Sequence, residues 1–345
     1  MTTGMKKFTK GCLITALVAF IIGAVICCVG GMLGGFKVLN SMDIREVTGI
    51  PLVYRFGPDG RFEYGFRPWR DSGIDWGGKY ENWQRIDNEE GGRALSLTAD
   101  TLRELYIEAG ACEVRIEESE DDQVRLAVSG DADTVRYHVD DGSLWIERQS
   151  GWRWFQVGVN KSSDKVYLYL PKGTNLDYLD IELGAGKMDS IGLKAQTANI
   201  EVGAGEADID SLTVDDEVIL SIGAGKIRVK ELICETADLD IGAGELDVDD
   251  ATIEEVANID LGMGSVNISG IIKGDLDVDC GMGQVTLELF DDEQDHNYDV
   301  DCSMGEVRVG SHSYSSMSSS QTIDNGTDSD YNIDCSMGTV KIIFK

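Results

Sequence analysis

The amino-acid sequence predicts an all-β protein, a parallel β-solenoid (β-helix) with 19–20-residue rungs, preceded by one N-terminal transmembrane helix. Three observations lead to this fold class. A Gly-x-Gly signature recurs through the C-terminal half, apolar and polar residues alternate on both sides of it, and a long uncharged run lies near the N-terminus. The first two indicate stacked rungs around one core, and the third indicates a membrane span.

The N-terminal region is expected to contain a cytoplasmic tail, residues 1–10, and a transmembrane helix, residues 11–36. The run 11–36 is 26 residues long and uncharged, whereas a helix needs ~20 residues to cross a bilayer. A signal-peptide core is only about 7–15 residues long, so we expect an uncleaved anchor. Because Lys6, Lys7 and Lys10 precede the run, the N-terminus is predicted to be cytoplasmic and the remainder extracellular.

Two segments separate this anchor from the regular repeats. Residues 37–92 combine glycines with aromatic residues, and we expect a juxtamembrane stalk or a partner-docking segment. Residues 93–178 contain short alternating strands, and we expect irregular rungs that cap the stack. Within them, residues 107–114 resemble a degenerate first copy of the repeat. One loop projects aromatic side chains and a cation, so it is either the candidate contact site or a folded-back cap: Trp152, Arg153, Trp154 and Phe155.

Residues 179–345 are expected to form the regular solenoid. Alternation of apolar and polar residues predicts strands with one buried face, and glycine suits the places where a strand turns or a neighbouring rung approaches closely. The Ala or Met between the paired glycines should stack on its counterpart in the next rung. The first glycine of each pair recurs in steps of 19 or 20 residues, at Gly184, Gly203, Gly223, Gly242, Gly262 and Gly281.

Two further rungs, at 302–305 and 335–338, follow after insertions that we expect to be surface loops. The final strand, 340–345, has no evident cap. An unpaired edge invites pairing with another chain, so we expect either a loop that covers it or end-to-end oligomerisation.

The charge of the chain excludes one class of partner. Lys and Arg number 30 against 62 Asp and Glu, which gives a net charge of −32, and such a surface repels nucleic acid. The simpler interpretation of this acidic excess is that it solvates a repetitive outer face. The alternative is that the acidic residues weakly bind divalent cations. The acids form two outward columns, one with Asp180, Asn199, Asp238, Asn258, Asp277, Asp299 and Asn332, the other with Glu182, Glu201, Asp240, Asp260, Asp279, Asp301 and Asp334.

The cysteines outside the predicted span are interpreted as core residues. Cys280, Cys302 and Cys335 occupy inward positions that earlier rungs fill with Leu, Ile or Val, so they should behave as small hydrophobic residues. Disulfides between neighbouring rungs remain the alternative. Neither a Cys-x-x-Cys motif nor zinc spacing is present, and we predict no metal and no cofactor.

The sequence offers little catalytic chemistry. His138, His296 and His312 are the only histidines, each in a polar or loop-like context and none beside an evident nucleophile. The sequence contains no Gly-x-Ser-x-Gly motif, no P-loop and no His-Glu-x-x-His motif. We therefore predict no catalytic residues and no enzyme, with a polysaccharide-acting enzyme as the least favoured alternative.

The stretch Val166–Gly184, with its strand, Pro171 and following repeats, resembles a bacterial family of β-strand-repeat proteins described as adhesin-like and of unknown function. The resemblance extends over about residues 95–345. It implies a surface location and a repeat fold. Some members have one N-terminal span and accompany envelope-stress signalling systems, and the family supplies no catalytic residues.

These observations together favour a single-pass membrane protein that displays its solenoid outside the cell. The leading hypothesis is a non-enzymatic cell-envelope module, an adhesin-like scaffold that binds a cell-wall polymer or another membrane protein. The alternative is a regulatory accessory of a membrane signalling or envelope-stress system.

Overall fold

The computed structural model describes residues 53–56, 62–65, 84–85, 93–129, 135–148, 165–314 and 319–345. The chain divides into two compact units, Met1–Gly73 and Ile74–Lys345. In the first unit, β1 (Val53–Phe56) and β2 (Phe62–Gly65) form an antiparallel pair. The predicted transmembrane helix, residues 11–36, lies outside the described residues, among which no helix is long and apolar enough to cross a membrane.

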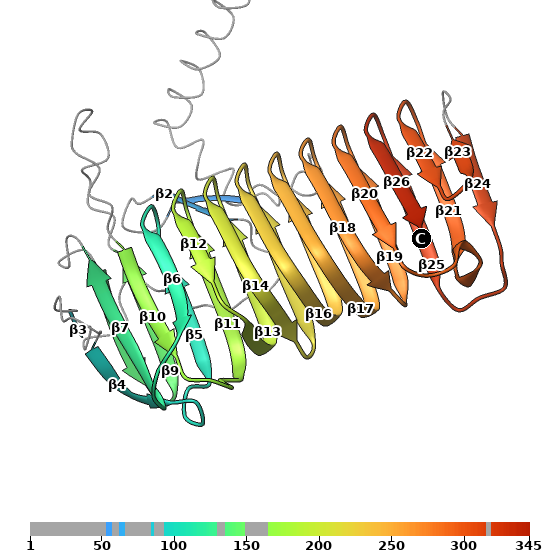
Figure 1. Ribbon diagram of the computed structural model, residues 1–345. Helices are drawn as coiled ribbons and strands as arrows, with labels where there is room; N and C mark the ends of the chain where they lie inside the picture. The colour runs from blue at the N-terminus through green and yellow to red at the C-terminus, as the bar shows by residue number, and fades with distance from the viewer. Residues whose placement is uncertain are drawn as a thin grey trace, which may run out of the picture. The chain divides into compact units, whose positions relative to one another are not determined.

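The second unit is a β-solenoid, which confirms the predicted architecture (Figure 1). A rung consists of a strand, a Gly-x-Gly turn, a second strand and a corner. Where the corner is also extended, long strands result, as in β16 (Lys226–Ile241) and β17 (Glu245–Leu261). Each rung pairs in parallel with the next, since the side-chain pattern repeats in register from rung to rung.

The strands that precede the Gly-x-Gly turns form one parallel sheet, here called the first sheet. In spatial order its members are β9 (Ser143–Arg148), β5 (Glu104–Glu108), β11 (Leu176–Leu183), β13 (Leu193–Val202), β15 (Glu217–Ile222), β16, β17, β19 (Asp275–Cys280), β25 (Asp330–Cys335) and β21 (Asn297–Cys302).

The strands that follow the turns form the second sheet, which runs alongside the first. In spatial order its members are β10 (Lys165–Leu170), β6 (Glu113–Glu118), β12 (Lys187–Ser190), β14 (Glu206–Val214), β16, β17, β18 (Ser265–Ile272), β20 (Gln284–Leu289), β26 (Thr339–Phe344) and β22 (Glu306–Val309).

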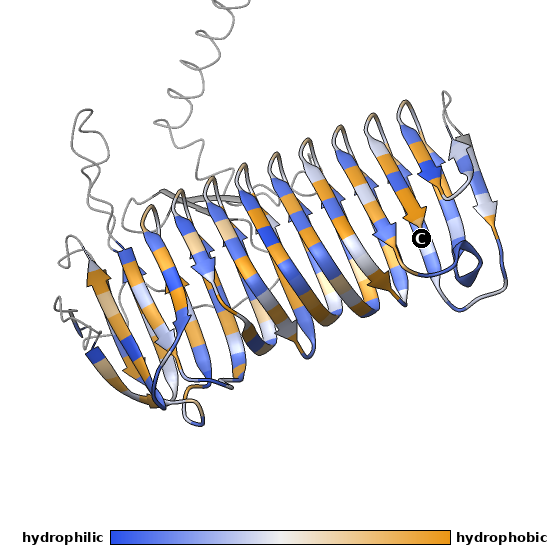
Figure 2. Cartoon of the chain, viewed as in Figure 1, coloured by the Kyte–Doolittle hydropathy of each residue, from blue (hydrophilic) through white to orange (hydrophobic). Residues whose placement is uncertain are grey.

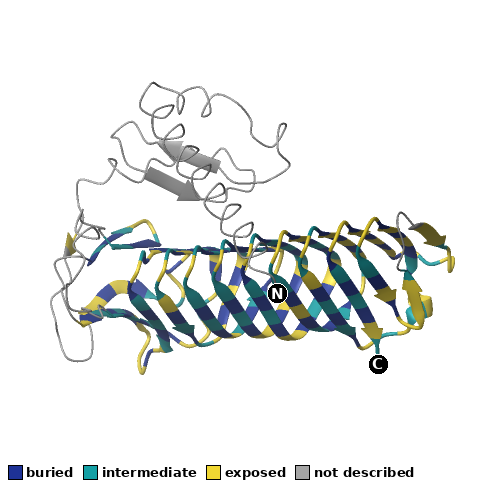
Figure 3. Cartoon of the chain, turned by 90° about the horizontal axis from the view of Figure 1, so that it is seen from above, coloured by how far each residue is buried: buried dark blue, intermediate teal, exposed yellow. Residues whose placement is uncertain are grey.

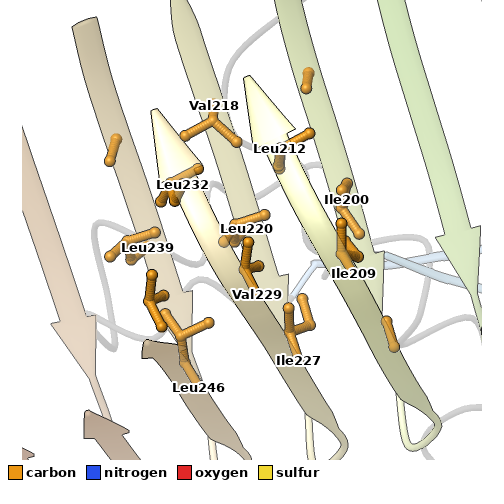
Figure 4. Close-up of a cluster of buried hydrophobic side chains, with 14 of the residues drawn as sticks. Ile200, Ile209, Leu212, Val218, Leu220, Ile227, Val229, Leu232, Leu239 and Leu246 are labelled. Atoms are coloured by element: carbon orange, nitrogen blue, oxygen red, sulfur yellow. The ribbon is translucent and has the colours of Figure 1, made fainter. Parts of the chain in front are cut away.

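Apolar side chains from both sheets meet in one continuous core. The strands show alternating burial, and the hydropathy of successive residues alternates along them (Figures 2 and 3). Leu220, Val229 and Ile209, from three neighbouring strands, pack together inside the solenoid (Figure 4). Burying one such side chain contributes about 1.5–3 kcal/mol, so the stack is stabilised by the repetition of this contact.

The glycines of the turns are required by the closeness of the next rung. A Cβ on Gly264 would lie 1.9 Å from the carbonyl oxygen of Gly244, and one on Gly186 would lie 2.0 Å from that of Cys112. Neither glycine has a positive φ, so steric contact between rungs, and not backbone conformation, excludes other residues here. The residue between the glycines instead projects outward, as Met263 does.

The two rungs nearest the C-terminus exchange places in space. The rung of β25 and β26 stacks directly on β19 and β20, and the rung of β21 and β22, which comes earlier in the chain, lies outside it. The expectation that 340–345 forms an unpaired edge is therefore wrong, because β26 pairs with a strand on each side.

The N-terminal end is organised in the same way. The rung of β5 and β6 contacts β11 and β12, which confirms residues 107–114 as a first copy of the repeat. Strands β9 and β10, later in the chain, lie outside that rung. The earlier rung lies inside at the N-terminal end and the later rung lies inside at the C-terminal end. In both cases the inner rung pairs with a strand on each side.

Short antiparallel strands cover the outermost strand at each end. At the N-terminal end β7 (Gln123–Ser129) pairs with β10, and β8 (Val135–Asp140) pairs with β9. Two further strands, β4 (Arg93–Thr98) and β3 (Gln84–Arg85), extend this layer. At the C-terminal end β24 (Ser319–Ile323) pairs with β21, and β23 (His312–Tyr314) pairs with β22. Short covering strands protect a sheet edge from pairing with other chains.

Candidate binding face

The outward positions of the first sheet carry the two predicted columns of polar side chains. Parallel pairing brings Asp240, Asp260, Asp279, Asp334 and Asp301 into one row, rung after rung. The spatial order of the last two differs from the sequence order because their rungs exchange places. The columns were correctly predicted since residues at a fixed place in successive rungs must align.

The neighbouring column alternates carboxylates with amides. Asn199 donates from Nδ2 to Oδ1 of Asp180 at 2.9 Å, and Asn332 donates to Oδ1 of Asp277 at 2.7 Å. Asn258 and Asn332 each separate two carboxylates that would otherwise be adjacent, whereas Asn199 lies between Asp180 and Ile219. Adjacent carboxylates at the ~4.8 Å spacing of strands repel by roughly 0.9 kcal/mol in water, and the asparagines remove that repulsion.

The C-terminal end of this face holds an exposed acidic group, defined as Asp277, Asp279, Asp299, Asp301 and Asp334. Within the described part of the chain, none of the five forms a salt bridge with Lys, Arg or His. Partial burial, followed by the charges of Asp301 and Asp279, raises the pKa of Asp334 above its usual value. The group therefore has negative charge that nothing within these strands neutralises.

We expect Asp334→Asn to stabilise the protein and Asn332→Asp to destabilise it, each by about 0.2–1 kcal/mol for the like-charge contacts removed or added.

The raised pKa of Asp334 means that the folded state holds its proton more tightly. The contribution of Asp334 to stability should therefore be largest below the ordinary Asp pKa of about 3.9 and be lost as the pH rises above it. Denaturation across this pH window measures the effect, which Asp334→Asn should reduce; an unchanged profile in that variant would contradict it.

The outward side of the second sheet is different because its charges are paired. Lys187 lies 3.2 Å from both Asp189 and Asp208, and Arg228 lies 2.9 Å from Asp208. Hydrogen bonds to Asp208 and Asp189 raise the pKa of Lys187. A shallow, open depression here is lined by Asp189, Asp208 and Arg228 together with Arg115. The charged side chains here already form ion pairs with one another, so we expect this depression to bind a charged ligand less strongly than the first sheet does.

Aromatic side chains continue the first column toward the N-terminal end. Trp145 and Tyr106 stack with ring centroids 5.4 Å apart, and Tyr106 and Tyr178 lie 5.6 Å apart. The Tyr106 hydroxyl donates to Glu104 at 3.1 Å, and burial, together with the charge of Glu104, raises its pKa. Tyr106 therefore stays a neutral donor at neutral pH.

The structure corrects the interpretation of two histidines. His138 and His296 are buried, and His296 lies beside a hydroxyl, since its Nδ1 is 2.7 Å from Ser329 Oγ. Its Nε2 is 3.0 Å from Asp291 Oδ2, and its ring stacks on Tyr331 at 4.1 Å. No sequence pattern indicates this cluster, because Ser329 is 33 residues away from His296 and belongs to another connection.

This Ser–His–Asp cluster is arranged as a structural clasp. Ser329 is only 8% exposed, and its hydroxyl donates to the carbonyl oxygen of Gly274 at 2.6 Å, away from solvent. A nucleophile must reach its substrate. The contact between His296 and Ser329 instead joins two connections, the one before β21 and the one before β25. These connections lead into the two rungs that exchange places.

The remaining sequence-based predictions can now be placed. The candidate contact loop, Trp152, Arg153, Trp154 and Phe155, lies outside the described residues. In the described ranges no group of three or more His, Cys, Asp and Glu side chains is arranged to hold a metal ion. The described cysteines are buried free thiols, as the core interpretation predicts, and in none of them is a disulfide formed.

The stacked rungs define a repeat protein of the β-solenoid class, and comparison with known proteins identifies its family. The model of the Toastrack DUF4097 family matches residues 102–343, so the chain belongs to this family. This confirms the resemblance seen at 166–184 and supports an adhesin-like domain at a general level. No curated protein matches the chain.

Several solved structures are similar to this chain. A candidate adhesin from Bacteroides fragilis NCTC 9343 has 12% identity and a TM-score of 0.40, with 76% of this chain and 95% of that one covered. A candidate cell adhesion protein from Clostridium sporogenes ATCC 15579 has 13% identity and a TM-score of 0.25, covering 76% and 99%. A candidate lipid binding protein from Parabacteroides distasonis ATCC 8503 has 13% identity and a TM-score of 0.35, covering 76% and 97%.

Proposed function

We propose that this protein is a non-enzymatic, adhesin-like binding scaffold of the cell envelope, anchored in the membrane by residues 11–36. The solenoid presents the first sheet to a partner that carries positive charge. A cell-wall polymer with cationic groups and a basic segment of another membrane protein both have this chemistry.

The acidic group is the observation that carries the proposal. Its five exposed carboxylates lie on three consecutive rungs without a salt bridge among the described residues, whereas the charges of the second sheet are paired. A surface of one sign attracts a partner of the opposite sign and speeds their encounter. The rigid stack keeps the carboxylates at a fixed spacing, which favours a partner with regularly spaced or closely grouped cations.

Two further observations support the non-enzymatic and anchored parts of the proposal. The serine of the Ser–His–Asp cluster at His296 donates its hydroxyl to the Gly274 carbonyl oxygen, which favours a structural role. The uncharged run 11–36, preceded by three lysines, has the length and flanking charge of a single span with the solenoid outside.

The test is binding of the full-length chain, reconstituted in vesicles, to envelopes from cells that lack the protein. A variant with Asp277, Asp279, Asp299, Asp301 and Asp334 changed to Asn should bind at least about tenfold more weakly, and wild-type binding should weaken as salt is raised. The matched control changes five other exposed acids to their amides and so removes equal charge: Asp215, Asp216, Asp249, Asp250 and Glu255.

Equal loss in both variants would mean that only net charge matters, and it would contradict a specific face. Retained binding after protease treatment of the envelopes would identify a wall polymer as the partner. Binding that protease abolishes would identify a membrane protein and favour the regulatory accessory.

A further inference from the structure

Four methionines form a row along the edge where the first sheet turns into the second. Met263, Met282, Met337 and Met304, in spatial order, are here called the methionine row. Their backbone amides donate to the preceding rungs, Met282 to Gly262 at 2.8 Å, Met337 to Gly281 at 2.8 Å and Met304 to Ser336 at 2.7 Å. These bonds place the four residues at the same position of four successive rungs.

The row is continuous in space although it is not consecutive in the chain. Met337 comes after Met304 in sequence, and the exchange of the last two rungs puts it beside Met282. The other four regular rungs carry alanine at this position, and those alanines are exposed as well: Ala185, Ala204, Ala224 and Ala243.

Packing does not account for the change from alanine to methionine. The four methionines are 62%, 54%, 52% and 68% exposed in spatial order, so they leave the core unaffected. The row is also one side chain wide, because glycine or serine flanks each methionine. Apolar docking surfaces are broad patches, and this narrow line of thioethers is not one.

Sulfur is concentrated at this end of the solenoid. Cys280, Cys335 and Cys302 come two residues before three of these methionines and form a column inside the core. The three thiols are buried. The exposed sulfur is therefore the thioether sulfur, which needs no deprotonation to act as a ligand.

We propose that the methionine row is a binding site for a soft monovalent cation, copper(I) or silver(I), held between thioether sulfurs of neighbouring rungs. Soft thioether ligands select copper(I) over hard cations. Rungs lie ~4.8 Å apart. If the zinc–sulfur bond length of about 2.3 Å is taken as a guide, two sulfurs on opposite sides of a cation lie roughly 4.6 Å apart. Flexible methionine side chains can adjust to this spacing without moving the backbone. The adjacent acidic group raises the local concentration of cations.

The test is a titration of the full-length chain with silver(I), in chloride-free buffer, followed by NMR of 13C-labelled methionine methyl groups. The methyl signals of the methionine row should shift, and Met282→Leu/Met337→Leu should weaken binding at least tenfold because only the two separated end thioethers remain. Met188→Leu, at a buried methionine outside the row, is the matched control and should change nothing. Ala243→Met should add a responsive methyl signal next to Met263. Copper(I), titrated without oxygen, should give the same order of affinities.

Two results would overturn the inference. One is silver(I) binding of equal strength in wild type and in Met282→Leu/Met337→Leu. The other is loss of the methionine shifts in Cys280→Ala/Cys335→Ala, a result that would assign the ion to the thiols. Since the methionines are exposed, the leucine variants should fold, and unchanged far-UV circular dichroism checks this.

Discussion

Replacing Gly264 with alanine is expected to destabilise the solenoid by at least about 3 kcal/mol. The new methyl group would lie 1.9 Å from the carbonyl oxygen of Gly244. That oxygen also accepts the Ser265 amide at 3.0 Å, so the clash would separate two rungs and break the hydrogen bond between them. Urea denaturation followed by circular dichroism measures the loss.

Gly192→Ala is the matched control for this substitution. The nearest atom to its added methyl group is the Ser211 Cβ at 3.5 Å, which is ordinary contact. We expect a change within about 0.5 kcal/mol, or a small gain from the reduced entropy of the unfolded chain. Equal urea midpoints for Gly264→Ala and Gly192→Ala would contradict the close stacking of the Gly-x-Gly turns.

Replacing His296 with alanine is expected to cost about 3 kcal/mol, because it removes one buried and one partly buried hydrogen bond and leaves Asp291 without its partner. Asp291 Oδ1 already lacks a hydrogen-bond partner, so its carboxylate would have little left to stabilise it. Hydrogen exchange should show the loss first in β21 and β25, the strands that follow the two clasped connections.

His312→Ala is the matched control, since His312 also lies 2.9 Å from a carboxylate, Glu293, but its side chain is 55% exposed. An exposed contact of this kind contributes about 0–1 kcal/mol. In the His296→Ala background, Asp291→Asn should recover part of the stability because a neutral amide is less costly to bury. A fully native His296→Ala protein would show that the cluster is not a clasp.

The repeat period predicted the regular rungs, because residues at fixed steps of 19 or 20 must align in a stack. The inward cysteines and the last members of the acidic columns were predicted from the signature that their rungs share with the regular ones. The exchange of the last two rungs could not be predicted in this way. Both rungs carry the same Cys-Ser-Met-Gly signature, so either order satisfies the pattern. The structure distinguishes them through Tyr331, whose hydroxyl donates to the Ile272 carbonyl at 2.8 Å, whereas Tyr298 bonds to Glu293 in its own connection.

The candidate sites differ in how much of each could be predicted from the sequence. The acidic columns follow from alternation and period alone. The His296 clasp joins Asp291, His296 and Ser329 across two connections without a repeat, and the methionine row depends on the rung exchange. Both require knowledge of which segments meet in space, which periodicity does not contain.

Binding through the acidic face is the central claim, and site-specific photo-crosslinking in living cells tests it most directly. A photoreactive residue would replace Asp279 on the first sheet or, as the control, Asp249, an exposed acid at the end of a second-sheet segment of β17. We expect the full-length protein to crosslink one class of positively charged partner from position 279 and not from position 249. Equal crosslinking from both positions, or crosslinking from position 249 alone, would contradict the claim.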